Sequence, residues 1–196
     1  GGKPVYLGSV SDDKTALTKA LKTAVASADM VVTSGGVSVG PKDYTAQIVD
    51  SLGKPGIVVY GIAVKPGKPT TVGFIGEKPV FCLPGHPTSA LLIFYLMAKP
   101  LIQQLAGKPV TGMKNVRAFA GARMFSAKGR RTFVMVKLEF DKDCRLIAEP
   151  AETGASGAIT TLAKADGFVE IGENEQFVDA NQEVSVALFR SVTRLG

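Results

Sequence analysis

Three loops rich in glycine and proline carry the residue types that bind anions. The first, Ser34–Gly40, contains Gly35, Gly36 and Gly40 around Val37 and Ser38. Glycines let the backbone turn tightly and bring its N–H groups against an anion, and the hydroxyl of Ser38 adds a side-chain donor. Taken alone, the loop fits either a ligand-binding segment or a structural turn. It matches neither the G-x-G-x-x-G dinucleotide motif nor the phosphate-binding loop that ends in G-K-[ST].

An acidic residue follows this loop. Asp43 precedes an apolar helical pattern that begins at Tyr44. Its carboxylate is suited to binding a cation or orienting a nucleophile, and it is equally suited to capping the helix.

The second loop, residues 65–69, presents two lysines between prolines. Lys65 and Lys68 lie three residues apart around Gly67. Two neighbouring ammonium groups repel each other, so an anion bound between them relieves the repulsion. We expect both lysines to share one anion-sized pocket with the first loop; the alternative is an exposed loop without a ligand.

The third loop, Leu83–Ser89, ends a strand pattern and opens the longest helical pattern. It contains Pro84, Gly85, His86 and Pro87, and His86 is the only histidine. Free amides at a helix start bind anions. For His86 a capping or loop hydrogen bond is commoner than general-base catalysis, and Ser89 is ordinary for a capping region.

Two polar clusters in the second half are further candidates. Arg130 and Arg131 follow Lys128-Gly129, and Ser156 lies in Gly154-Ala155-Ser156-Gly157. Guanidinium forks suit oxyanions, although from the residues alone a charged β-turn is the favoured explanation of the arginines.

The elements that must position these loops follow an α/β pattern up to about residue 108. Periodicity predicts strands at 5–10, 30–33 and 56–64, a hairpin at 70–83, and helices that start at Asp12-Asp13, span 44–52 and span 88–105 with a bend near Pro100. In open α/β sheets ligands bind at the carboxyl ends of strands, so the loops are expected to share one crevice.

Beyond Gly107-Lys108-Pro109 helical periodicity gives way to strands. These are expected at 116–122, 132–140, 146–149, 168–171 and 183–188. The sequence therefore predicts an α/β domain over residues 1–108 and a small all-β, barrel-like domain over 109–196, with few contacts crossing between residues 105 and 111.

Composition narrows the function classes. Residues 1–108 carry eleven Lys, no Arg and six acidic residues, and the remainder carries twelve basic and eleven acidic residues. The basic excess favours an anionic small molecule, whereas the missing arginines argue against nucleic acid. The longest apolar runs are too short to span a membrane, and a protein with one histidine is a poor zinc binder. Cys82 and Cys144 are expected to be reduced core thiols in a cytoplasmic protein.

Order and spacing of the three loops resemble one family. Asp29–Gly40 with Asp43-Tyr44, then Lys65-Pro66-Gly67-Lys68-Pro69, then Leu83-Pro84-Gly85-x-Pro87, are similar to the MoeA and gephyrin E-domain family of molybdopterin molybdotransferases. In the second half, Gly129-Arg130-Arg131-x-Phe133 and Ser156-Gly157 followed by Leu162–Gly167 resemble the family's C-terminal β domain. The resemblance implies a three-layer α/β/α MogA-like domain, lacking its first strand and helix, followed by a β barrel.

The resemblance also implies a reaction. The family inserts molybdate, or tungstate, into adenylylated molybdopterin in molybdenum cofactor biosynthesis, as a homodimer with Mg²⁺. Asp43, Asp12 and Asp13 would be catalytic, with Asp43 on Mg²⁺. The pterin would contact Gly35–Ser38, Gly40 and Pro84–Pro87, and the oxyanion would contact Lys65, Lys68, Ser89, Arg131 and Ser156.

Two other functions stay open from the residues alone. A MogA-type adenylyltransferase resembles the first half but has a threonine-rich loop and no β domain, and a non-catalytic scaffold fragment leaves no mark in the sequence. Because the family's N-terminal domains have no counterpart in these 196 residues, we expect the isolated chain to be inactive.

Overall fold

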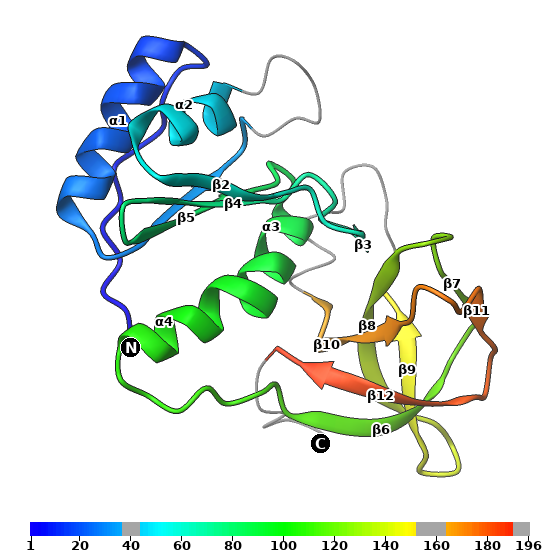
Figure 1. The fold of residues 1–196 in the computed structure, drawn as a ribbon. Coiled ribbons are helices and arrows are strands. Elements are labelled where there is room, and N and C mark those ends of the chain that lie inside the picture. Colours follow the sequence, from blue (N-terminus) through cyan, green and yellow to red (C-terminus); the bar gives the residue numbers. More distant parts are fainter. Residues whose placement is uncertain (37–43, 152–163, 190–196) are drawn as a thin grey trace. The chain divides into compact units, whose positions relative to one another are not determined.

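The computed structural model describes residues 1–36, 44–151 and 164–189, which form two compact units (Figure 1). The first unit comprises Gly1–Ile62 and Gly67–Val110, and the second comprises Ala63–Pro66 and Thr111–Gly196. Four residues from the first half of the sequence thus belong with the second unit. The sequence pattern, which predicted one division between residues 108 and 109, gave no sign of this excursion.

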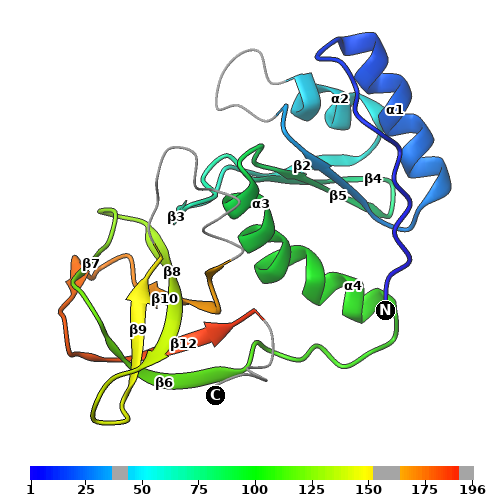
Figure 2. The same ribbon diagram turned by 180° about the vertical axis from the view of Figure 1, so that it is seen from behind.

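The first unit has three layers around a four-stranded sheet. The strand order is β1-β5-β4-β2, with β1 parallel to β5 and the other pairs antiparallel. Helices cover both faces of the sheet (Figures 1 and 2), as the α/β/α prediction required. The strands are β1 (Val31–Ser34), β2 (Pro55–Tyr60), β4 (Thr71–Ile75) and β5 (Lys78–Leu83). The helices are α1 (Lys14–Ser27) and α2 (Tyr44–Leu52) on one face, and α3 (Pro87–Ile93), η1 (Phe94–Ala98) and α4 (Lys99–Leu105) on the other.

Helix α1 begins where the sequence predicted. The Asp13 side chain accepts a hydrogen bond of 2.8 Å from the backbone N–H of Ala16, so it satisfies one of the free donors of the first turn. Leu21 and Ala24 are buried against the sheet in a core with Ile48 and Val49 of α2. The one helical face that is apolar is therefore the face that packs.

The long helix over residues 87–105 is interrupted by a wider turn rather than simply bent. Residues Phe94–Ala98 form a π-helical segment in which the N–H of Lys99 reaches the carbonyl of Phe94. Pro100 follows directly, and a proline lacks the N–H and crowds the carbonyl four residues earlier. The π-helical segment therefore coincides with the turn before Pro100, whose normal hydrogen bonding the proline prevents.

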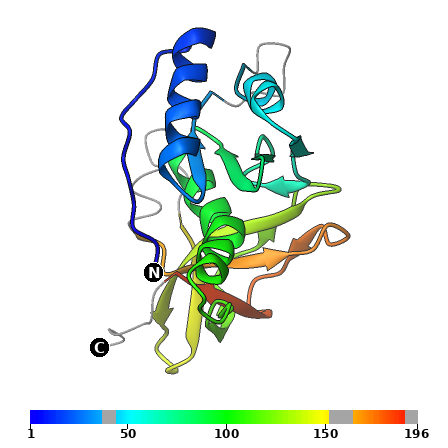
Figure 3. The same ribbon diagram turned by 60° about the vertical axis from the view of Figure 1, so that its left-hand side comes forward.

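One predicted strand is wrong. Residues 5–10 run as an extended stretch beside α1 (Figure 3) but make no strand pairing with the described chain. Val5, Tyr6 and Leu7 are 59%, 85% and 48% exposed. Apolar, β-prone side chains become a strand only where a neighbouring backbone offers its hydrogen bonds, and these residues find none.

The second unit contains a closed five-stranded barrel, which confirms the barrel prediction. Its strands pair in the circle β10-β12-β6-β9-β8, and β8 returns to β10. The bounds are β6 (Asn115–Ala120), β8 (Arg131–Phe140), β9 (Leu146–Pro150), β10 (Gly167–Ile171) and β12 (Glu183–Leu188). A short strand, β3 (Val64–Lys65), adds to β8 in parallel. Figure 2 gives the same strands from behind.

Alternation along the strands fills the barrel core. Val136 and Leu138 of β8 are buried with Ile171 and Val186, whereas Lys137 between them is exposed. A two-stranded ribbon, β7 (Met124–Phe125) with β11 (Phe177–Val178), adds Met124 and Val178 to this core. The sequence did not predict the ribbon, because two residues are too few to show an alternating pattern.

The two cysteines differ in environment. Neither forms a disulfide, and Cys82 is buried in the core of the first unit. Cys144 is exposed in the β8–β9 turn with φ of 60°, so the expectation of a second core thiol is wrong. No helix in the described ranges has the length and apolar character needed to cross a membrane.

We predict that Gly167→Ala opens the barrel at its β10–β12 seam. A methyl group at Gly167 would lie 2.2 Å from the carbonyl oxygen of Ala187, so the strand ladder must separate. The expected loss of unfolding free energy is about 2 kcal/mol or more, measured by urea denaturation. Gly112→Ala, where nothing lies within 4 Å of the added carbon, is the control. Equal stability of the two variants would contradict the proposed clash.

We also predict that Asp13→Ala costs about 1 kcal/mol of unfolding free energy, because the cap of α1 is lost. Asp12→Ala removes an exposed neighbour that makes no capping bond, and it should change stability by less than about 0.5 kcal/mol. The difference between the two midpoints in the same denaturant series is the measurement. A larger effect at Asp12 would show that the cap is assigned to the wrong carboxylate.

Candidate functional site

Two of the three predicted loops meet at one edge of the first sheet. Because β1 and β5 are parallel neighbours, their carboxyl ends lie side by side. The N–H of Gly35 donates to the carbonyl of Leu83 (3.1 Å), and the hydroxyl of Ser34 donates to the carbonyl of Pro84 (3.1 Å). A β-carbon on Gly85 would lie 3.4 Å from Cα of Gly35. The structure therefore brings Gly35, Pro84 and Gly85 together.

The first loop leaves β1 in a conformation that requires glycine. Gly35 and Gly36 have φ of 86° and 69°, in the left-handed region. The buried hydroxyl of Thr45 in α2 donates to the carbonyl of Gly36 (3.2 Å) and fixes the direction of the chain. Val37, Ser38, Gly40 and Asp43 lie outside the described residues, so their predicted roles stay predictions.

The third loop leads into α3 with an exposed His86 and a buried Ser89. His86 is the residue before the helix, and its side chain makes no capping hydrogen bond. Pro87 occupies the first helical turn, where a missing N–H costs nothing. The hydroxyl of Ser89 donates to the carbonyl of His86 (2.9 Å), and Ser89 is 4% exposed. Of the two roles that the sequence left open for Ser89, the structure shows the local capping role; contact with an oxyanion stays a prediction.

The two acidic residues before α1 have different roles in the structure. Asp13 uses its carboxylate as the helix cap, and Asp12 is exposed. Within the described ranges no group of three or more His, Cys, Asp or Glu side chains is arranged to hold a metal ion.

The two loop lysines belong to different units. Lys65 lies on β3 in the second unit, whereas Lys68 lies in the first, and both side chains are exposed. The carbonyl of Lys68 accepts from the N–H of Ile62 (3.0 Å), and Gly67 accepts from Thr70, so the turn between them is hydrogen-bonded. Their predicted pocket, shared with the first loop, stays a prediction.

The tandem arginines of the second unit are in contrasting surroundings. Arg131 pairs with Glu170 at 3.2 Å and with Glu173 at 3.4 Å. Arg130, which precedes β8, makes no ion pair or side-chain hydrogen bond with any described residue. Of these two guanidinium groups, that of Arg130 is therefore the one without a partner among the described residues, and the sequence pattern grouped it with Arg131 without selecting it.

Strand register decides which arginine Lys65 accompanies. Lys65 lies opposite Thr132, and Val64 lies opposite Arg131. Because side chains alternate along a strand, Lys65 shares a face with Thr132 and, two residues earlier, Arg130; Arg131 projects from the other face. Only the register carries this information, so the sequence alone does not provide it. Ser156, the remaining candidate, lies outside the described residues.

The residues whose pKa is clearly shifted, Lys137 and Asp141, lie outside the candidate site. Hydrogen bonds from the backbone N–H of Arg145 and from its side chain help to lower the pKa of Asp141, and Glu139 raises the pKa of Lys137. These residues belong to the β8–β9 hairpin and to none of the predicted loops.

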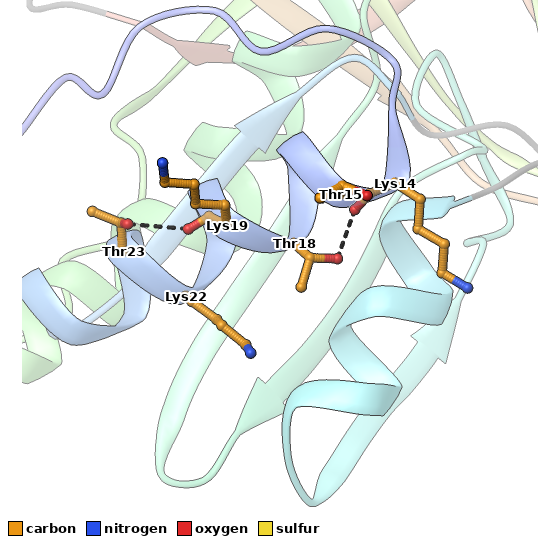
Figure 4. Close-up of a pocket in the computed structure, with 6 residues that line it drawn as sticks. All are labelled: Lys14, Thr15, Thr18, Lys19, Lys22 and Thr23. Carbon is orange, nitrogen blue, oxygen red and sulfur yellow. Dashed lines mark hydrogen bonds between the residues drawn. The ribbon is translucent and has the colours of Figure 1, made fainter.

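A surface cavity of about 590 Å³ lies on α1 (Figure 4). It is lined by three lysines and three threonines of that helix: Lys14, Thr15, Thr18, Lys19, Lys22 and Thr23. Thr18 and Thr23 donate to the helix carbonyls of Lys14 and Lys19, so their protons are already used. None of the predicted site residues lines this cavity.

Comparisons with known proteins agree with this division of the chain. Residues 1–104 match the family described as a probable molybdopterin binding domain, and residues 117–189 match the MoeA C-terminal region, domain IV. The crystal structure of a molybdopterin biosynthesis MoeA protein from Pyrococcus horikosii is 41% identical, with a TM-score of 0.83 over 97% of this chain and 45% of that one.

Curated relatives carry related names. A protein of Methanocaldococcus jannaschii named for molybdopterin biosynthesis is 34% identical over 92% of this chain and 42% of its own length. A molybdopterin molybdenumtransferase of Nostoc is 31% identical over 95% of this chain and 43% of its own. The chain thus spans less than half the length of these relatives. On the match of both domains in their order, the chain belongs to the MoeA family, of which it contains the molybdopterin-binding domain and the C-terminal domain.

Proposed function

We propose that this chain is the pterin- and oxyanion-binding portion of a molybdopterin molybdotransferase. The reaction is the insertion of molybdate, or tungstate, into adenylylated molybdopterin with hydrolysis of the adenylate. The observation that carries the proposal is the meeting of Gly35 with Pro84 and Gly85 at the carboxyl ends of two parallel strands, where α/β sheets bind ligands.

In the first unit, the proposed role is to hold the pterin phosphate. Glycines at positive φ let the backbone approach an anion closely, as at Gly35 and Gly36. The loop continues to Ser38, Gly40 and Asp43, for which we propose donor, backbone and catalytic roles, with His86 and Pro87 on the adjoining loop.

In the second unit, the proposed role is to hold the oxyanion. Lys65 and Arg130 share a face beside Thr132, and neither has a side-chain partner in the described part of the chain. Two cations presented together attract a dianion, and the arginine fork adds paired N–H donors. On the resemblance, Lys68, Ser89 and Ser156 are proposed as further oxyanion contacts, whereas the charge of Arg131 is already paired with Glu170 and Glu173.

Magnesium does not fit the described residues by themselves. Asp13 caps a helix, Asp12 is a single carboxylate, and no cluster of three metal-binding side chains occurs in the described ranges. The resemblance assigns the ion chiefly to Asp43, and no step of the proposed mechanism passes through it. A homodimer in the cytoplasm is proposed on the same resemblance, and two cysteines without a disulfide agree with that compartment.

The attached second domain argues against an adenylyltransferase of the MogA type. Enzymes of that class lack a β domain, whereas residues 117–189 of this chain match the MoeA C-terminal region. No described feature favours a scaffold role over catalysis.

We predict that Lys65→Gln and Arg130→Gln each weaken molybdate binding about tenfold, because each removes one charged hydrogen-bond donor from the oxyanion. Binding to the 196-residue chain is followed by NMR titration, which detects weak complexes. Lys114→Gln removes the same charge from an exposed lysine of the same unit, which has no side-chain partner among the described residues, and it should leave affinity unchanged. If all three variants bind as the parent does, the oxyanion is not held by this pair.

We further predict that the isolated chain does not convert adenylylated molybdopterin to molybdenum cofactor. It spans less than half of its relatives, and catalysis requires the pterin and oxyanion to be held to within about half an ångström. Fusion to the upstream half of the 41% identical MoeA protein should restore molybdate-dependent cofactor formation, and Asp43→Asn in the fusion should abolish it. Turnover by the 196-residue chain comparable to the fusion would refute the requirement for upstream sequence.

A further inference from the structure

Arg131 stands where three strands of the second unit meet. Its backbone N–H donates to the carbonyl of Ala63, just before β3, at 3.0 Å. Its Nη1 lies 3.2 Å from Oε1 of Glu170 on β10, and its Nε and Nη2 each lie 3.4 Å from Oε2 of Glu173. One residue therefore connects β3, β8, β10 and the turn that follows β10.

The turn that presents Glu173 is itself closed. The N–H of Gly172 donates to Oε2 of Glu175 (2.8 Å), and the N–H of Glu175 donates to the carbonyl of Gly172 (3.1 Å). A carboxylate on a hydrogen-bonded turn loses less freedom on pairing than one on an open loop, so the pair with Arg131 is better defined than a typical surface pair.

The charge of Arg131, unlike that of Arg130, is not available to bind an anion. Two carboxylates neutralise it, and register places it on the face opposite Lys65. The contacts of Arg131 instead affect β3, the strand that carries Lys65. Because β3 has only two residues and pairs only with β8 in the described chain, its position depends on that of β8.

We propose that Arg131 is a positioning residue: by joining β8 to Glu170 and Glu173 it fixes the end of β8 on which β3 docks, and so sets the place of Lys65 beside Arg130. This proposal rests on the proposed function, since Lys65 and Arg130 are the groups assigned there to the oxyanion. The tandem arginines thus have separate roles, one toward the anion and one toward the fold around it.

The two possible roles of Arg131 predict opposite signs for Glu173→Gln. If Arg131 positions Lys65, loosening the pair weakens molybdate binding. If Arg131 contacts the oxyanion, release from a competing carboxylate strengthens it. Because the paired side chains are about half exposed, the expected weakening is about threefold. The titration is run at about 0.3 M salt, where the Debye length is below about 8 Å and a distant charge change is screened.

Matched variants complete the design. Glu183→Gln removes a carboxylate that pairs with Arg117 in the same unit and should not alter affinity. Arg131→Gln also breaks the pair with Glu170, so it should weaken binding at least as much as Glu173→Gln. The double variant should lose no more than Arg131→Gln alone, because Glu173→Gln removes part of the same connection. Tighter or unchanged binding by Glu173→Gln overturns the proposal.

A second readout needs no ligand. Amide exchange at position 131, whose N–H holds the carbonyl of Ala63, should quicken in Glu173→Gln while the thermal midpoint of the chain stays within about 2 °C of the parent. Unchanged exchange refutes the positioning role. If instead Lys65→Gln and Arg130→Gln leave molybdate binding intact, the proposed oxyanion site fails, and the exchange result still decides the role of Arg131.

Discussion

Closure of the second unit depends on one strand, β8. Its residue Thr132 pairs with Ile171 of β10 on one edge and with Lys65 of β3 on the other, and farther along Val136 pairs with Gly167 and Pro150. Closing a barrel removes the free sheet edges that would otherwise demand partners. Because β9 pairs only with Val136–Phe140, the start of that edge of β8 is left, and β3 pairs with it at Arg131 and Thr132. A lysine from the first half of the sequence is thereby placed among the residues of the second.

The first unit depends in a similar way on a single parallel pairing. β1 and β5 are separated by more than forty residues, yet their ladder brings two glycine-containing loops into hydrogen-bonding contact. Both loops combine a strand end with residues that have no bulky side chain at the point of approach. The proposed anion binding rests on this arrangement rather than on the hydroxyls of Ser34 and Ser89, which bond to backbone carbonyls.

The sequence predicted those elements that are long enough to show a periodic pattern of apolar residues. Helix α2 and the five barrel strands were found because each spans five or more residues, long enough to show a helical period or a strand-like run of apolar residues. The ribbon β7–β11 was missed for the opposite reason. Val5–Val10 was mistaken for a strand because composition records a preference for β structure, whereas a strand also needs a partner.

The candidate site was predictable in its loops and not in its side-chain assignments. Strand-loop order is local, so the meeting of Gly35 with Pro84 and Gly85 could be anticipated from the pattern of the first half. The choice between Arg130 and Arg131 depends on which face of β8 each occupies and on the carboxylates across from it, which are some forty residues away. No local pattern records register, so a motif of two adjacent arginines leaves the choice open.

The π-helical turn at Phe94–Ala98 has a consequence for comparing related sequences. It is equivalent to inserting one residue into a helix, and each residue advances an α-helix by about 100°. The apolar stripe of Pro87–Ile93 and that of Lys99–Leu105 therefore cannot be described by one continuous 3.6-residue period. A relative that lacks the wider turn would keep the same two stripes only if it were one residue shorter there. An alignment that allows no gap within this helix would then pair its last two turns with the wrong face.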